Sequence, residues 1–149
     1  MKVFLLIISI LLSSYSYASA RDDSCEAIII RVMRATDGSS VKSYTNMAII
    51  SHSILGKIRT SCAPGMTGVS VDIDEEYPSN SWFYYAGLAA GALFDEDPTV
   101  YEDLLRKCHL RVRKNPSEDV TEATTGGSLE CSGKARTTYL ALWTTNPRK

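Results

Sequence analysis

Two histidines, His52 and His109, are the side chains best suited to general acid–base catalysis near neutral pH. His52 lies between two serines and has no metal-binding partner four positions on, which favours a partly exposed structural histidine in a helix. His109 follows a cysteine in a basic stretch, and we expect it to be solvated. No Gly-x-Ser-x-Gly elbow, glycine-rich phosphate loop or His-Glu-x-x-His motif accompanies them. The sequence therefore predicts no catalytic site and a protein that is not an enzyme.

Four acidic residues are spaced in a way that superficially resembles a calcium-binding loop: Asp72, Asp74, Glu75 and Glu76. The glycine and the distal glutamate that complete such a loop are missing. Zinc sites usually need closely spaced ligand pairs, and the cysteines supply none. We therefore expect neither a metal ion nor a cofactor.

The stretch from residue 60 to residue 105 contains nine acidic residues, no basic residue and a run of aromatic residues. A helix cannot direct four consecutive aromatic side chains into one core, so one or two of them should be exposed or half-buried. Aromatic anchors flanked by charge are typical of tight protein interfaces, here with a cationic partner. The alternative is a solvated acidic surface that caps helix starts. The predicted partner-binding residues are Asp72, Asp74, Glu75, Glu76, Trp82, Phe83, Tyr84, Asp95, Glu96 and Asp97.

The first twenty residues have the order of a secretory signal peptide. Lys2 precedes an apolar run over residues 3–12, and small residues at positions 18 and 20 form a cleavage site. We expect residues 1–20 to be removed and residues 21–149 to form one domain in the periplasm or outside the cell. The near-neutral charge of that domain argues against nucleic-acid binding, and the apolar run is too short to predict a membrane span.

Four cysteines follow the predicted signal peptide: Cys25, Cys62, Cys108 and Cys131. In a small secreted domain an even number predicts two structural disulfides, for which three pairings are open. No Cys-x-x-Cys spacing is present, which argues against a redox site of the thioredoxin type. The alternative is a free or catalytic thiol.

Helix signals dominate the first half of the chain. Ser24 and the two preceding aspartates favour a helix over residues 25–35, and an apolar pattern predicts a second helix over residues 45–60. Two antiparallel helices of this kind would place Cys25 beside Cys62. Alternating apolar residues over 69–73 predict a short strand.

A third helix is predicted over residues 82–94, capped by residues 79–81. Gly87 and Gly91 lie on one face of it, and their cost to the helix requires a closely packed neighbour. The fourth helix has the clearest signals, because Asp97 can cap it, Pro98 suits its first turn, and an Asn-Pro pair follows residue 114.

Polar residues over 117–130 predict a long loop with a turn at its glycine pair. Residues 133–145 fit either a helix capped by Ser132 or a strand. A Cys108–Cys131 bridge would pin this last segment to the fourth helix. The expected fold class is therefore mainly α, with four or five helices stapled by disulfides and room for one short strand pair.

Several patterns in residues 86–139 resemble the periplasmic immunity proteins of type VI secretion amidase effectors. They are Ala86-Gly87 through Phe94, Val100-Tyr101-Glu102-Asp103-Leu104, Gly127-Ser128-Leu129-Glu130-Cys131, and Tyr139. The resemblance implies a small helical protein that binds and blocks a peptidoglycan-cleaving amidase delivered by a neighbouring cell.

The sequence as a whole therefore favours a periplasmic protein-binding inhibitor of a cell-wall hydrolase, as a monomer or a homodimer. The first alternative is a small secreted hydrolase or virulence factor that uses cysteine or serine chemistry. The second is a subunit of an envelope assembly.

Overall fold

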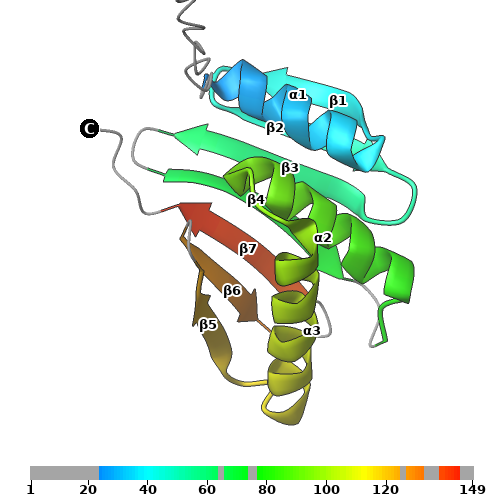
Figure 1. Ribbon diagram of the computed structural model, residues 1–149, viewed down its shortest axis with the longest axis vertical. Helices are drawn as coiled ribbons and strands as arrows, with labels where there is room; N and C mark the ends of the chain where they lie inside the picture. The colour runs from blue at the N-terminus through cyan, green and yellow to red at the C-terminus, as the bar shows by residue number, and fades with distance from the viewer. Residues whose placement is uncertain (1–23, 64–65, 74–76, 125–126, 133–137, 145–149) are drawn as a thin grey trace, which may run out of the picture.

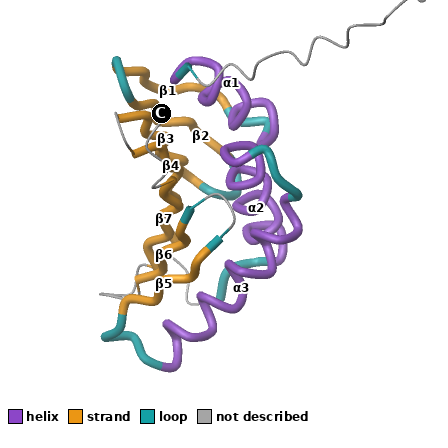
Figure 2. Tube along the Cα trace, turned by 60° about the vertical axis from the view of Figure 1, so that its left-hand side comes forward, coloured by secondary structure: helices purple, strands orange, loops and turns teal. Residues whose placement is uncertain are grey.

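Three helices cover one face of a seven-stranded antiparallel sheet (Figures 1 and 2). The computed structural model describes residues 24–63, 66–73, 77–124, 127–132 and 138–144, so the predicted signal peptide lies outside the described residues. The prediction of a mainly α fold with four or five helices is wrong, because the described chain forms an α+β fold with three helices and seven strands.

The first helix, α1 (Cys25–Thr36), is confirmed within one residue of its predicted end. Its cap is Ser24, whose Oγ accepts a hydrogen bond from the backbone N–H of Ala27 at 3.2 Å. It ends at Asp37, which adopts a left-handed conformation with φ 51° and turns the chain into the sheet.

The predicted helix over residues 45–60 is wrong. This stretch contains β2 (Met47–His52) and the first part of β3 (Gly56–Ala63), with the turn between them. Together with β1 (Ser39–Tyr44), which ends just before it, these strands pair as a meander. Burial alternates along β2 and β3 with the period of two that a half-covered sheet requires. The residues that face the helices are Ala48, Ile50, His52, Ile58, Thr60 and Cys62.

The turn between β2 and β3 divides the stretch that the apolar pattern predicted to be one continuous helix. His52 Nδ1 accepts hydrogen bonds from the backbone N–H groups of Ile54 and Leu55 at 3.1 and 3.0 Å. Gly56 follows with φ 68°, a conformation that other residues rarely adopt. The side chain of residue 52 thus closes a hairpin at the point where a helix was expected to continue.

The predicted strand over residues 69–73 is confirmed as part of β4 (Met66–Ile73). The helices α2 (Asn80–Phe94) and α3 (Pro98–Lys114) are also confirmed, and both begin at their predicted caps. Ser79 Oγ accepts from the backbone N–H of Trp82 at 3.1 Å, and Asp97 Oδ1 accepts from that of Thr99 at 2.9 Å.

The two glycines of α2 allow α3 to approach closely, as predicted. A Cβ atom added to Gly87 would lie 2.8 Å from the carbonyl oxygen of Pro98, and one added to Gly91 would lie 2.8 Å from that of Glu96. Real Cβ atoms do not approach other atoms so closely. The contact therefore requires glycine at both positions and sets how the two helices cross.

The predicted loop over residues 117–130 is wrong. It contains β5 (Asp119–Ala123) and most of β6 (Ser128–Ser132), and the ambiguous last segment forms β7 (Thr138–Thr144). The strand order is β1-β2-β3-β4-β7-β6-β5, so β7 pairs with β4 and joins two meanders into one sheet. The pairing at the centre of the sheet is therefore between β4 and β7, which are distant in sequence.

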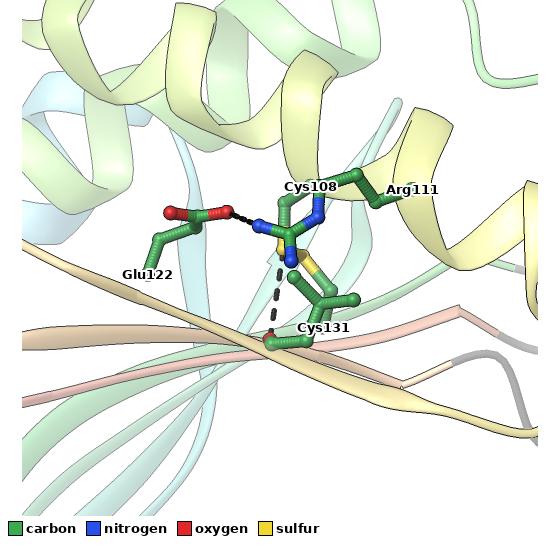
Figure 3. Close-up of a disulfide and its surroundings, with 5 residues drawn as sticks. Cys108, Arg111, Glu122 and Cys131 are labelled. Atoms are coloured by element: carbon green, nitrogen blue, oxygen red, sulfur yellow. Dashed lines mark hydrogen bonds and ion pairs between the residues drawn. A yellow bond between two sulfur atoms is a disulfide. The ribbon is translucent and has the colours of Figure 1, made fainter.

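Both predicted disulfides are confirmed, and all four cysteines are bridged. Cys25 joins Cys62, which ties α1 to β3; the partner element is a strand and not a second helix. Cys108 joins Cys131, which ties α3 to β6 (Figure 3). Beside that bridge an ion pair between Arg111 and Glu122 links α3 to β5. Covalent and ionic contacts therefore fix α3 on the sheet.

Candidate functional site

A hollow of about 240 Å³ lies where the segment before α2 meets the second half of α3. Its lining residues, which together define the Tyr77–Leu110 hollow, are Tyr77, Pro78, Phe83, Arg106, His109, Leu110 and Arg113. The close contact of α2 with the start of α3 turns the two helices back on each other, and the first residue of α2, Asn80, lies against Arg106 in the middle of α3. The close helix crossing thus brings residues 77–83 and 106–113 together.

Two guanidinium groups of α3 lie over the two aromatic rings of the hollow. The Cζ atom of Arg106 is 4.5 Å from the centre of the Phe83 ring, and that of Arg113 is 4.0 Å from the centre of the Tyr77 ring. Each is a cation–π contact, which stabilises a charge that is partly removed from water. The rings therefore hold positive charge at the rim of the hollow.

Arg106 is further fixed by hydrogen bonds. Its Nε and Nη2 atoms donate to Glu102 Oε1 at 3.2 and 2.6 Å, and its Nη1 atom donates to Asn80 Oδ1 at 2.9 Å. Arg106 and Glu102 form an ion pair one helical turn apart, and the bond from Arg106 to Asn80 ties α3 to the first residue of α2. This guanidinium has a defined position before any ligand arrives.

The expectation that His109 is solvated is wrong. Its side chain is only 5% exposed and packs edge-on against Phe83, with ring centres 5.7 Å apart. Residues 106, 109 and 113 share the helix face that meets α2, because they are three and four positions apart. The histidine forms the floor of the hollow between the two arginines.

Apolar side chains stand exposed at the rim. Tyr77 is 68% exposed and Leu110 is 56% exposed, the highest values among the large apolar residues whose burial is described. Large apolar side chains beside charged groups are the usual composition of protein-binding surfaces. The hollow therefore offers ring faces, aliphatic surface and positive charge within one site.

Comparison of the chain with family models, curated proteins and solved structures gives no match. Inferences about function therefore rest on the residues themselves.

The predicted partner-binding residues do not form one surface. Asp72 pairs with Arg59 at 2.8 Å, and Arg59 lies between the inward-facing Ile58 and Thr60, so this pair is on the sheet face away from the helices. Asp74, Glu75 and Glu76 lie outside the described residues. Tyr84 is on the helical side of the molecule and is 51% exposed. That these residues bind a partner stays a prediction, and the described ones are spread over both faces of the sheet.

Two of the predicted anchors belong to the core. Trp82 is 6% exposed and Phe83 is 5% exposed, with their rings edge-on at 5.3 Å. The expectation that one or two of the four consecutive aromatic residues remain accessible is confirmed by Tyr84 and the half-buried Tyr85. Replacing Trp82 by alanine would therefore test the fold, since core tryptophans contribute about 3–5 kcal/mol to stability.

The acidic residues between α2 and α3 have roles within the chain. Asp95 adopts a left-handed conformation at the end of α2, and Asp97 caps α3. Glu96 Oε2 accepts a hydrogen bond from the hydroxyl of the fully buried Tyr101 at 2.7 Å. Burial and this carboxylate raise the pKa of Tyr101, so the phenol stays protonated. All three acidic residues thus have structural roles at the junction of α2 and α3.

His52 has a structural role in the sheet and not in a helix. It is 9% exposed, closes the β2–β3 turn through Nδ1, and lies 4.5 Å from the Tyr85 ring. Burial lowers its pKa, while a hydrogen bond with the backbone of Thr36 and the charge of Asp37 act in the opposite direction. A protonated ring would lose the acceptor that the turn requires.

This geometry predicts a loss of stability in mild acid. Because the folded-state pKa of His52 lies below its ordinary value of 6.5, the unfolded chain binds the proton first as pH falls. We expect the free energy of unfolding to be constant above pH 6.5 and to fall as pH drops from 6.5 towards the lowered pKa. Urea titrations across this range measure it.

The matched variant is His52→Asn, whose side-chain oxygen can accept the same turn hydrogen bonds without titrating. The decline below pH 6.5 should become shallower in this variant. An identical pH profile in both proteins would show that His52 does not carry the effect.

Within the described ranges, no three His, Cys, Asp or Glu side chains are grouped as metal ligands would be. No helix of the described chain is long and apolar enough to cross a bilayer. All four cysteines are bridged, which removes the cysteine nucleophile from the secreted-hydrolase alternative; its serine version stays a prediction.

Proposed function

We propose that this chain is an extracytoplasmic protein-binding inhibitor and that the Tyr77–Leu110 hollow is its docking surface. The observation that carries the proposal is the pair of exposed anchors, Tyr77 and Leu110, beside arginines whose positions are set by ring and hydrogen-bond contacts. A surface that is ordered before binding loses less conformational entropy in a complex.

The two disulfides support this proposal in two ways. They are compatible with an oxidising compartment, where bridged cysteines persist. The Cys108–Cys131 bridge also lies within the helix segment that lines the hollow, so it holds that segment against the sheet. Small secreted inhibitors commonly depend on such staples because their cores are small.

A cell-wall hydrolase is the proposed partner, and an amidase delivered by a neighbouring cell is the first candidate. This choice comes from the sequence resemblance to periplasmic immunity proteins. The helical fold that the resemblance implied is contradicted by the seven-stranded sheet. The amidase thus rests on sequence patterns, whereas the docking surface rests on the geometry of α2 and α3.

The test measures digestion of purified peptidoglycan by a panel of purified cell-wall amidases, with increasing amounts of the oxidised protein. We expect the activity of at least one amidase to fall to near zero at about one equivalent, as for other tight inhibitors. Tyr77→Ala and Leu110→Ala should each weaken inhibition about tenfold or more, as hot-spot residues do.

Two matched controls come from the same helices. Tyr84→Ala removes a tyrosine that is 51% exposed on α2, and Val100→Ala removes an aliphatic residue that is 50% exposed on α3. Neither lines the hollow, so inhibition should remain unchanged. Loss of inhibition in Tyr84→Ala but not in Tyr77→Ala would overturn the hollow as docking surface. Failure of every amidase to respond would overturn the partner class.

A further inference from the structure

We propose that the sheet face opposite the helices, here called the open face, binds the open face of a second copy of this chain. All three described helices lie on the other side of the sheet (Figure 2). The strand register places opposite charges at positions that a two-fold axis brings together. In such a dimer the two sheets meet, and each Tyr77–Leu110 hollow stays on the outer, helical side.

Burial along the strands shows which charged residues belong to the open face. Ile49 and Glu130 each lie between two fully buried neighbours, so both side chains point away from the helices. Lys42 pairs with Ile49 after a register shift in β1, which puts Lys42 on the same face. Its Nζ atom lies 4.9 Å from the centre of the Tyr44 ring, and Tyr44 is 43% exposed. No described cation pairs with Glu130.

Lys42 and Glu130 lie in one row of paired positions across the sheet. From β1 to β6, the residues of this row are Lys42, Ile49, Arg59, Ser70, Ala141 and Glu130. The lysine and the glutamate are therefore equally far from the boundary between β3 and β4, at about 12 Å for strands about 4.8 Å apart. A two-fold axis along the strands at this boundary lays Lys42 over Glu130 of the second copy, and Glu130 over its Lys42. One contact type thus forms twice in the dimer.

The adjacent row of the open face repeats this charge pattern. Lys57 precedes Ile58, and Asp72 follows Val71, the residue that pairs with Ile58. The same axis therefore sets Lys57 over Asp72 of the second copy. Because Asp72 already pairs with Arg59 at 2.8 Å, this contact extends an existing ion pair and contributes less than the contact between Lys42 and Glu130.

The residues next to the axis allow the two sheets to approach. Ser61 pairs with Gly68 across the boundary between β3 and β4, and both are small. Aligned sheets pack about 10 Å apart with their strands within about 30° of each other. Six overlapping strands of five paired positions cover roughly 500 Å² per copy, a total near the low end of specific interfaces. We therefore expect a weak dimer, with a dissociation constant of about 1–100 μM.

Sedimentation velocity of the oxidised protein, at concentrations on both sides of that range, measures the dimer. We expect the dissociation constant to rise about threefold or more between about 50 and 500 mM NaCl, because the paired charges are exposed. A protein that stays monomeric at every concentration would overturn the proposal.

Charge reversal tests the pairing itself. In Lys42→Glu two acidic groups face each other at both contacts, and in Glu130→Lys two basic groups do, so each variant should dimerise about tenfold or more weakly. An equimolar mixture of the two variants should form a mixed dimer with about the wild-type affinity, since opposite charges then meet at both contacts. This restoration also shows that both variants are folded. A mixture that dimerises no better than either variant alone would reject the contact between Lys42 and Glu130.

The matched control is Lys107→Glu, which makes the same charge change at an exposed position of α3 on the helical side. Its dissociation constant should stay within about twofold of the wild-type value, because only screened long-range charge changes. A dimer that Lys107→Glu weakens as much as Lys42→Glu does would mean that the second copy binds elsewhere, and the proposal would be wrong.

The dimer and the proposed inhibition can be tested separately. Tyr77→Ala should dimerise as the wild-type protein does, and Lys42→Glu should still inhibit the amidase, because the hollow lies on the helical side. Dimerisation with the predicted charge dependence would support the open-face contact even if no amidase responds. A wild-type protein that is monomeric, and whose inhibition is lost in Lys42→Glu, would assign the open face to the protein partner and overturn the dimer.

Discussion

Replacing Cys108 and Cys131 together by alanine is expected to lower the free energy of unfolding by roughly 3 kcal/mol. The bridge closes a loop over a sequence separation of 23 residues, and its loss frees that loop in the unfolded chain. Both cysteines are fully buried, so the smaller alanines also leave unfilled space. This is a large part of the roughly 5–15 kcal/mol that stabilises a typical domain.

Urea unfolding of the double variant against the wild-type protein measures this loss, and a thiol assay confirms the state of the remaining bridge. The effect should extend to the hollow, because the lost bridge fixes the segment of α3 between Arg106 and Arg113. We expect the double variant to inhibit the amidase more weakly even where it remains folded. An unchanged urea midpoint would show that the bridge does not stabilise the protein.

The second bridge provides the control. The C25A/C62A variant removes a bridge of similar loop length, with a sequence separation of 37 residues, so it should lose a similar free energy of unfolding. That bridge joins α1 to β3, and neither element lines the hollow. Inhibition of the amidase by the folded protein should therefore be preserved. Equal loss of inhibition in both variants would mean that the two bridges act only through global stability.

The helices could be predicted from the sequence because their signals are local. Ser24, Ser79 and Asp97 each cap a helix within three residues of their own position, and each forms the expected hydrogen bond. Gly87 and Gly91 indicated that another element packs closely against α2, but the sequence did not show which one. Local chemistry thus gave the positions of all three helices that the structure describes.

The strands could not be predicted so readily because their stability comes from distant partners. In the second predicted helix, apolar residues fit both a period of 3.6 and two short strands separated by a turn. The turn between the two strands decides in favour of strands. In it, the His52 side chain accepts backbone hydrogen bonds, and Gly56 adopts a positive φ. In β5 and β6 the inward positions are few, and they become apparent only when the strands pair with each other and with β7.

The pairing of cysteines shows how a correct result can follow from a wrong structure. Cys25 was expected beside Cys62 because two helices would form a hairpin, yet Cys62 lies in β3. Either arrangement returns the chain to the start of α1. Proximity in this case depended on the length of the connection and not on the type of element.

The hollow could not be predicted because it depends on a tertiary contact. In the sequence, Arg106 and Arg113 appear as basic residues in the second half of a helix, His109 appears as a solvated histidine between them, and Tyr77 appears as part of an acidic stretch. Only the antiparallel crossing of α2 and α3 places the two groups together. The signal that could have indicated it was the spacing of three and four positions, which puts Arg106, His109 and Arg113 on one helix face.

The same crossing predicts a large loss of stability when Gly87 and Gly91 are both replaced by alanine. Alanine favours a helix by roughly 1 kcal/mol per position over glycine, so an exposed site would gain stability. At these positions the added Cβ atoms would meet Pro98 and Glu96 at 2.8 Å, and the atoms they meet belong to the backbone. The helices must therefore move apart.

Overpacking of this kind usually costs about 1–3 kcal/mol per site, which exceeds the gain in helix propensity. We expect the double variant to lose roughly 2–3 kcal/mol in urea unfolding, allowing for the propensity gain. The control is Ser81→Ala at an exposed position of α2, which should change stability by no more than about 0.5 kcal/mol. A double variant more stable than the wild-type protein would contradict the close crossing.

The same substitution distinguishes the fold from the site. Separation of α2 and α3 would move Phe83 away from Arg106, whose guanidinium lies 4.5 Å from that ring, and would lengthen the bond from Arg106 to Asn80. We therefore expect the double variant to inhibit the amidase more weakly than Ser81→Ala does, under conditions where both proteins are folded. Retained inhibition with reduced stability would show that the hollow does not depend on the crossing, and that Arg113 and Tyr77 suffice to form it.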